Sequence, residues 1–215
     1  MTVYEHAMLG WTLAITVGCH RRQGWAIAAM AGLAAALSDI DGVSLLFGPV
    51  AFANIHRIWA HNILVAAVLG LLTGLAGYLS SRSLRVQRGA SAVMKHLASD
   101  VKMDAPVAKP FVGRDCAVWM AMGTLAALSH LPTDIIFNGS AELPPWPVPL
   151  GWPFSERGWE LPIVPWGDQV TTVILIAEMF CLYFWSNRSQ AIAGLTLLAI
   201  AVYVGIRWLV VGLAA

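Results

Sequence analysis

Residues 61–80 read HNILVAAVLGLLTGLAGYLS, a stretch of twenty residues without an Asp, Glu, Lys or Arg. A helix of roughly 20 apolar residues can cross the hydrocarbon layer of a membrane, which is about 30 Å thick. Five more apolar stretches accompany it, at residues 4–19, 24–38, 115–138, 169–186 and 190–212. The sequence therefore predicts an all-α, polytopic membrane helix bundle with six transmembrane helices.

The composition of the whole chain agrees with a membrane location. Hydrophobic residues make up 58% of the 215 residues and charged residues only 12%, whereas a soluble domain carries about 25% charged residues. This composition excludes a water-soluble single domain, and we expect residues 1–215 to form one membrane domain. The net charge of +1 gives no reason to expect nucleic acid as a partner, so membrane lipids are the expected partners.

Two long connections differ from the apolar stretches. Residues 81–113 contain six Lys or Arg residues, and their apolar residues recur at helical spacing, which is typical of a basic amphipathic helix on a membrane surface. Residues 139–168 contain seven of the eleven prolines and four of the ten tryptophans. Proline excludes a long helix there, and tryptophan favours the headgroup layer of a membrane. We expect an interfacial loop.

The basic residues predict how the bundle is oriented. With six spans, the connections near 20–23, 81–114 and 187–189 share one side, and they hold most of the Lys and Arg residues. Cytoplasmic loops of membrane proteins carry such an excess. We therefore expect this side to face the cytoplasm of a bacterial cell, with both termini and the 139–168 loop outside.

His and Asp residues gather at the opposite, outer ends of the predicted helices. An unpaired ionisable group inside a membrane costs several kcal/mol, so their common position favours a common partner. Metal coordination is the simplest explanation. The candidate ligands are His6, Asp39, Asp41, His56, His61, His130 and Asp134.

The spacing of these residues supports convergence to different degrees. His130 and Asp134 are four residues apart and share one face of a helix. Asp39 and Asp41 lie at a helix end, where an irregular backbone can turn both carboxylates to one point. His56 and His61 are five residues apart and converge only if His56 precedes the helix.

Taken singly, each feature also has a simpler interpretation. His6 could be an interfacial helix-start residue, and the Asp39–Gly42 segment could be a turn or cap. His56 with Arg57 could bind a lipid phosphate, and His130 with Asp134 could form an internal hydrogen-bonded pair. The metal hypothesis depends on all of them meeting on one side of the membrane.

In its order of motifs the chain resembles a known family, the LexA-binding, inner-membrane-associated hydrolases, also described as membrane-bound metal-dependent hydrolases. The matching motifs are HAMLG from His6, DIDG from Asp39, HRIWAH from His56, HLPTD from His130 and PFS at 153–155. The family prefers PDID and HRxxTHS, where this chain has Ser38-Asp39-Ile40-Asp41 and Ala60-His61-Asn62. The chain thus lacks the Thr and Ser hydroxyls that would orient His61, and Asn62 could substitute for them. The resemblance implies a metal-dependent hydrolase.

The first functional hypothesis is therefore a membrane-embedded hydrolase that acts on a phosphoester or other ester of a lipid at the outer face. One or two divalent transition-metal ions would activate water. Histidine and carboxylate ligands fit zinc, and also manganese or iron. Arg57 would neutralise a phosphate or a developing oxyanion. A free carboxylate, Asp41 or alternatively Glu156 of the loop, would be the general base.

Two alternatives come from other functional classes. The first is a non-catalytic membrane subunit, in which the metal or polar cluster is structural and the aromatic loop docks a partner. The second is a metal-ion carrier. The last two apolar stretches contain no charged residue except Glu178 and Arg207, and this lack of a continuous polar path disfavours a carrier.

Overall fold

The fold is given by a computed structural model that describes residues 1–88, 110–140 and 144–214. Within these residues the secondary structure is helical and no strand forms, which confirms the expected all-α class. The elements are α1 (Val3–Thr16), α2 (Cys19–Gln23), α3 (Ala26–Ala36), the 3-10 helix η1 (Leu37–Phe47), α4 (Pro49–Ile55), α5 (Ile63–Arg82), α7 (Gly113–Ile136), α8 (Gln169–Phe184), the 3-10 helix η2 (Ser186–Arg188) and α9 (Ser189–Ala214).

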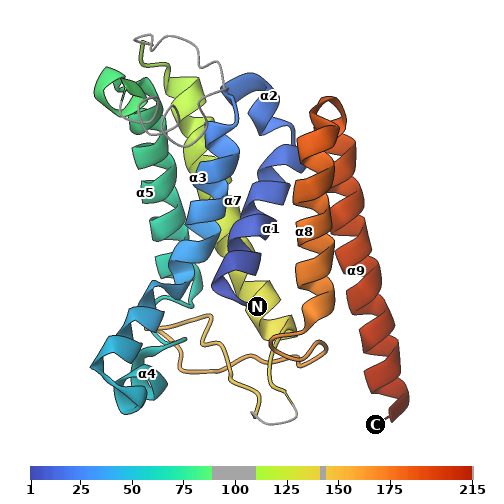
Figure 1. Ribbon diagram of the computed structural model, residues 1–215. Coiled ribbons are helices and arrows are strands. Elements are labelled where there is room, and N and C mark those ends of the chain that lie inside the picture. The colour runs from blue at the N-terminus through green and yellow to red at the C-terminus, as the bar shows by residue number, and fades with distance from the viewer. Residues whose placement is uncertain (89–109, 141–143, 215) are drawn as a thin grey trace.

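The long helices run side by side and give the bundle two distinct ends (Figure 1). One end carries α2 and the turn between α8 and α9, and we call it the α2 end. The other carries α4, the start of α1 and the loop that follows α7, and we call it the α4 end. The ligand-type residues singled out in the sequence lie toward the α4 end.

Local sequence explains where α5 begins and where α3 passes into the 3-10 helix η1. Asn62 begins α5, because its side-chain oxygen accepts a hydrogen bond from the backbone N–H of Val65 at 2.9 Å. After Ala36 the chain continues from α3 directly into η1, where short Ser and Asp side chains compete for backbone hydrogen bonds and weaken α-helix. Gly48, with φ of 103°, ends η1.

Small residues bring the central helices into backbone contact. A Cβ atom on Gly70 of α5 would lie 2.5 Å from the carbonyl oxygen of Gly123 on α7. A Cβ atom on Gly10 of α1 would meet the carbonyl oxygen of Ala31 on α3 at the same distance. Lipid tails are as apolar as the side chains, so the hydrophobic effect does not drive helices together in a membrane. Close van der Waals packing of this kind is therefore a main source of helix association. The central helices are therefore held at short, fixed separations.

The six apolar stretches are all helical, but the predicted count of six membrane crossings is not confirmed. In the described part of the chain, three segments are long and apolar enough to cross, namely Trp25–Phe47, Ile63–Arg82 and Ser186–Val211. Helix α1 has 14 residues and α8 has 16, which at 1.5 Å per residue gives lengths of only about 21 and 24 Å.

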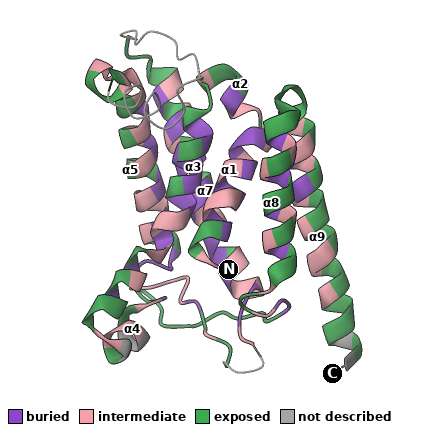
Figure 2. Cartoon of the chain, viewed as in Figure 1, coloured by how far each residue is buried: buried purple, intermediate pink, exposed green. Residues whose placement is uncertain are grey.

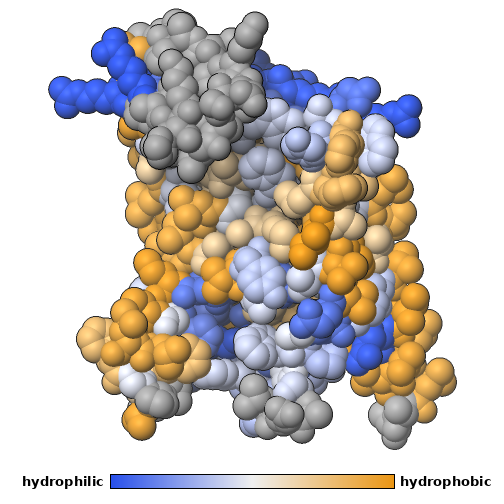
Figure 3. Space-filling model, viewed as in Figure 1, coloured by the Kyte–Doolittle hydropathy of each residue, from blue (hydrophilic) through white to orange (hydrophobic). Residues whose placement is uncertain are grey.

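The outer surface is that of a membrane protein. Exposed residues cover the outward faces of α5, α8 and α9 (Figure 2), and they include large apolar side chains such as Leu195, Leu198 and Val202. Hydrophobic residues form the sides of the bundle, while hydrophilic residues appear along the α2 end and in the interior near the α4 end (Figure 3). An apolar surface of this extent fits contact with lipid.

Only the two ends of the first long connection lie within the described residues, whereas most of the second is described. Residues 84–88 are helical, but residues 89–109, where most of the basic amphipathic helix is expected, lie outside the described residues. The 144–168 segment contains no helix, as expected from its prolines. It folds back beneath α7, where Ile163 N–H donates to the Ile136 carbonyl and Asn138 N–H donates to the Val164 carbonyl, both at 3.1 Å.

Candidate metal centre

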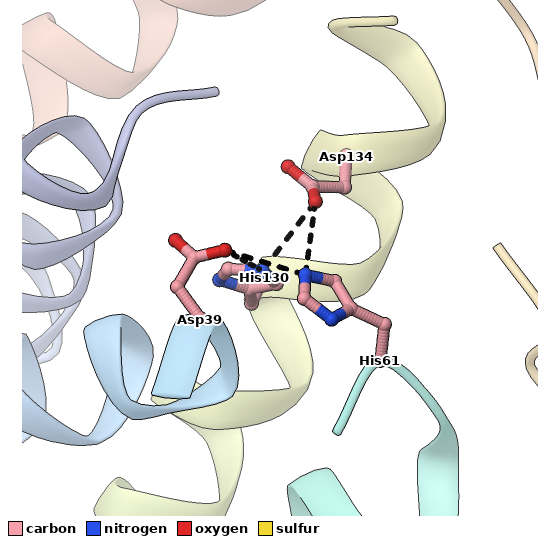
Figure 4. A group of neighbouring side chains, drawn as sticks. All are labelled: Asp39, His61, His130 and Asp134. Carbon is pink, nitrogen blue, oxygen red and sulfur yellow. Dashed lines mark ion pairs between the residues drawn. The ribbon is translucent and has the colours of Figure 1, made fainter. Parts of the chain in front are cut away.

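Four ligand-type side chains converge near the α4 end (Figure 4). His61 Nε2 lies 3.3 Å from Asp39 Oδ1 and 3.3 Å from Asp134 Oδ2. His130 Nε2 lies 3.6 Å from the same Asp39 oxygen and 3.5 Å from the same Asp134 oxygen. The four atoms lie within 4.8 Å of one another, so these residues could hold a metal ion. We call them the four-ligand group.

The two imidazoles present the nitrogen that a metal would need. His130 Nδ1 donates to the Ala35 carbonyl at 2.9 Å, and His61 Nδ1 donates to Asp41 Oδ2 at 3.0 Å. Each ring therefore carries a proton on Nδ1, and Nε2 is the ring nitrogen that faces the two carboxylates. Both Nε2 atoms are buried without a hydrogen-bond partner, and so is Asp39 Oδ2. Buried polar atoms rarely lack a partner, and a bound cation would supply one.

Asp41 forms a second group with the other side of His61. Its Oδ2 accepts from His61 Nδ1 and, at 3.1 Å, from the Arg57 backbone N–H, and its Oδ1 accepts from His56 Nδ1 at 2.8 Å. His56 precedes α5, which is the condition under which His56 and His61 were predicted to converge. Asp41, His56 and His61 also have the geometry of a metal group, but here they satisfy one another.

The two aspartates of the DIDG motif thus reach His61 from opposite sides. The sequence indicates that an irregular backbone turns both carboxylates to one point. In η1, however, a 3-10 turn takes three residues, so residues two apart point in well-separated directions. Asp39 joins the four-ligand group, whereas Asp41 holds the imidazole from behind.

Asn62 has a different role from the one that the sequence suggested. It was predicted to orient His61, but its side chain caps α5 through Val65 and donates to the Trp59 carbonyl at 2.7 Å. Orientation of His61 comes from Asp41 instead.

His6 contacts the centre without joining either group. Its Nε2 hydrogen-bonds Asp134 Oδ1 at 3.0 Å, and its ring stacks on His130 with 3.6 Å between ring centroids. The Met1 amino group donates to the same Asp134 oxygen at 2.9 Å. His6 therefore fixes the carboxylate of Asp134 through the oxygen that faces away from His61 and His130.

Arg57 lies beside the four-ligand group in a strained backbone conformation. It has φ of 63°, unusual for a residue other than glycine. This conformation lets its backbone N–H reach Asp41 while Nη2 of its side chain lies 3.3 Å from Asp134 Oδ2. The side chain is 5% exposed, and its Nε has no hydrogen-bond partner.

Two residues that sequence reasoning missed hold Arg57 in place. Arg57 Nη1 donates to Asn138 Oδ1 at 3.3 Å and to the Trp146 carbonyl at 3.1 Å, while Asn138 Nδ2 donates to the same carbonyl at 2.9 Å. Asn138 is four residues beyond Asp134, a spacing that could have revealed it. Trp146 lies in the proline-rich segment, where no periodicity predicts a contact.

Two cavities adjoin Arg57 on the loop side. One, of about 520 Å³, is lined by Trp146, Trp152 and Glu156 among others. A smaller one, of about 160 Å³, reaches His56 and Asn138. The PFS motif contributes little here, because Phe154 is 88% exposed. Among the described residues, three aspartates in this layer face two buried cations, the Arg57 guanidinium and the Met1 amino group, so the remaining negative charge favours a bound cation.

The comparisons with known proteins agree with the membrane assignment. A family model described as YdjM inner membrane protein matches residues 1–213, almost the full chain. No curated protein and no solved structure matched the chain. The match confirms the expected inner-membrane family, and the hydrolase character stays a prediction.

Proposed function

Because the chain belongs to this inner membrane protein family, we propose that it is a membrane-embedded, metal-dependent hydrolase acting on a phosphoester or other ester of a lipid. The observation that carries the proposal is the pair of buried Nε2 atoms on His61 and His130 that form no hydrogen bond. Both are aimed at one oxygen of Asp39 and one of Asp134. A purely structural polar cluster would be expected to give each of these nitrogens a hydrogen bond.

We propose one metal ion, held by the four-ligand group. Two imidazole nitrogens and two carboxylate oxygens suit zinc, with manganese or iron as alternatives. When bound, such an ion polarises the oxygen of the ester and activates water for attack. The Asp41, His56 and His61 group already forms a closed set of hydrogen bonds, and it therefore needs no second ion.

The surrounding residues would divide between positioning and charge stabilisation. Asp41 is fully buried, and both of its oxygens accept hydrogen bonds, which suits orientation of His61 better than the general-base role predicted from sequence. His6 would orient Asp134. Arg57 would stabilise negative charge on a phosphate or oxyanion, because its guanidinium stays protonated and lies beside Asp134.

A lipid substrate fits the surroundings of the centre. The cavity of about 520 Å³ connects Arg57 to the tryptophan-rich segment, and large apolar side chains of that segment are exposed, including Trp159 and Trp166. Tryptophan is typical of the membrane–water interface. A headgroup bound in this cavity would place its ester near Arg57.

We place the centre near the outer face of the inner membrane. The α2 end carries Arg21, Arg22 and Arg82 on α2 and α5, and a basic end faces the cytoplasm in most membrane proteins. The centre lies toward the opposite end.

A second function is favoured by a different observation. His61, His130 and Asp134 are almost completely buried, while Phe154 and the nearby tryptophans are exposed. A non-catalytic subunit with a structural metal centre and an aromatic surface for a partner would have these two features.

The deciding experiment measures metal content and lipid hydrolysis on the same detergent-purified protein. Metal would be measured by mass spectrometry, and products would be identified after incubation with a lipid extract. We expect about one equivalent of metal and a released headgroup or acyl product. His130→Gln should lose both, and His20→Gln, a histidine at the α2 end, should keep both.

Two results would contradict the proposal. A folded wild type that takes up no zinc, manganese or iron would exclude the metal centre. A metal-loaded wild type that yields no product from a broad panel of phospholipids and acyl lipids would favour the structural subunit.

A further inference from the structure

The α2 end contains two adjoining cavities that the proposed function does not use. One, of about 590 Å³, lies between α2, the start of α7 and the start of α9. The other, of about 790 Å³, lies between α3, α5 and α7. They share Arg22, Gln23 and Asp115 in their walls. Volumes of this size accommodate ligands of a few hundred daltons.

The first cavity is lined by cations that have no counter-ion. Arg21, Arg22 and Arg114 are exposed and form no ion pair with a carboxylate in the described part of the chain. Asp115 is the one acidic residue in the cavity wall, and it is already engaged. Its Oδ1 accepts from Gln23 Nε2 at 2.9 Å and its Oδ2 accepts from Arg82 Nη2 at 3.3 Å. Within the described residues, the cavity therefore carries an uncompensated positive charge.

Part of the wall of the second cavity is apolar, and the rest is polar, with Ser80 and Ser81 among its residues. Its wall includes Trp25, Ala26, Met30 and Trp119. Trp25 is 43% exposed, and an exposed tryptophan beside a ring of arginines is typical of the headgroup layer. Arg82, which lies over the Tyr78 ring at 3.7 Å, stands at the polar end of this cavity.

We propose that the two cavities form one binding site for an anionic phospholipid. The phosphate would lie among Arg21, Arg22 and Arg114, whose guanidiniums match phosphate oxygens. An acyl chain would lie along Trp25, Met30 and Trp119. Basic pockets between membrane helices on the cytoplasmic side bind lipid headgroups in this way. The site lies at the opposite end of the bundle from the four-ligand group, so it does not depend on hydrolysis.

The apolar cavity favours a lipid over a soluble phosphate compound. Inorganic phosphate or a nucleotide would need only the arginine-lined cavity, and it would leave the apolar wall without a function. A lipid uses both. Basic residues that only set the orientation of the protein in the membrane need no cavity. Arg188 is such a residue, because it lies at the same end of the bundle but lines neither cavity.

The experiment uses the full chain, purified in a neutral detergent and stripped of lipid. Binding of phosphatidylglycerol and phosphatidylcholine with identical acyl chains would be measured by native mass spectrometry. The variants are the triple Arg21→Gln, Arg22→Gln, Arg114→Gln protein, the matched control Arg188→Gln, and Ala26→Trp, which fills the apolar cavity. Thermal unfolding would identify any variant that fails to fold.

We expect phosphatidylglycerol to bind about tenfold more tightly than phosphatidylcholine. The triple variant should lose this preference, Arg188→Gln should keep it, and Ala26→Trp should weaken phosphatidylglycerol binding. The proposal would be overturned if both lipids bound equally, or if Arg188→Gln lost the preference as fully as the triple variant. Glycerol 3-phosphate that displaced the lipid at equal concentration would assign the site to a soluble anion instead.

Discussion

Replacement of Asp41 by Asn tests whether the carboxylate behind His61 controls metal binding. The wild-type carboxylate accepts from His61 Nδ1 at 3.0 Å and from His56 Nδ1 at 2.8 Å. An amide has the same size but only one acceptor oxygen and no charge. It would hold the His61 ring less firmly and make its Nε2 a weaker ligand.

The expected loss of affinity is about 10- to 100-fold, the range found when such an outer hydrogen-bond partner is removed. This corresponds to about 1.4–2.8 kcal/mol. At a metal concentration 100 times the wild-type dissociation constant, bound metal stabilises the wild type by about 2.7 kcal/mol. A variant with 30-fold weaker binding would gain only about 0.9 kcal/mol under the same conditions.

The assay is competition for zinc against a fluorescent chelator, combined with thermal unfolding with and without zinc. The matched control is Ser44→Ala in the same 3-10 helix, because Ser44 is buried and donates to the Asp41 backbone carbonyl at 2.6 Å without touching His61. It should lose about 1 kcal/mol of stability and keep its zinc affinity. Wild-type affinity in Asp41→Asn, or an equal loss of affinity in Ser44→Ala, would refute the assigned role.

Three further predictions concern charge, packing and orientation. At matched metal loading, Arg57→Ala should lower turnover by about 10²- to 10³-fold, and unchanged turnover would remove Arg57 from the site. Gly70→Ala should destabilise the bundle by about 1–3 kcal/mol, because its Cβ would meet a carbonyl oxygen at 2.5 Å. Gly194→Ala in α9, with nothing within 4 Å, should be neutral or stabilising in the same unfolding assay, and equal effects would contradict the packing. In a cysteine-free background, an impermeant thiol reagent applied to intact cells should label Ser155→Cys but not Ser186→Cys, and the reverse result would invert the orientation.

The parts of the centre that follow from local spacing could be predicted from the sequence. His130 and Asp134 meet because residues four apart share a helix face, and both reach the same group. The convergence of His56 and His61 depended on where α5 begins, and the sequence indicated that condition without settling it. Because Asn62 caps α5, both His56 and His61 precede the helix, and the condition is met.

The remaining parts depend on tertiary packing. The contacts of Arg57 with Asn138 and Trp146 join segments more than eighty residues apart in the chain, and no local pattern encodes such a distance. Hydropathy also predicted six crossings, whereas three helices among the described residues meet the requirement of length and composition. Short apolar helices such as α1 are buried by their neighbours as well as by lipid, and composition alone does not distinguish the two environments.

The Gly70–Gly123 contact has a consequence for which ions the protein can select. His61 lies nine residues before Gly70, just ahead of α5, and His130 lies seven residues, about two helical turns, after Gly123. The separation of α5 and α7 at this contact is set by main chains that touch, rather than by side chains that can change rotamer. An ion too large for the site would have to push apart two backbones that are in van der Waals contact. Methyl groups added at these glycines would widen the gap and alter the size preference, although every ligand would still be present.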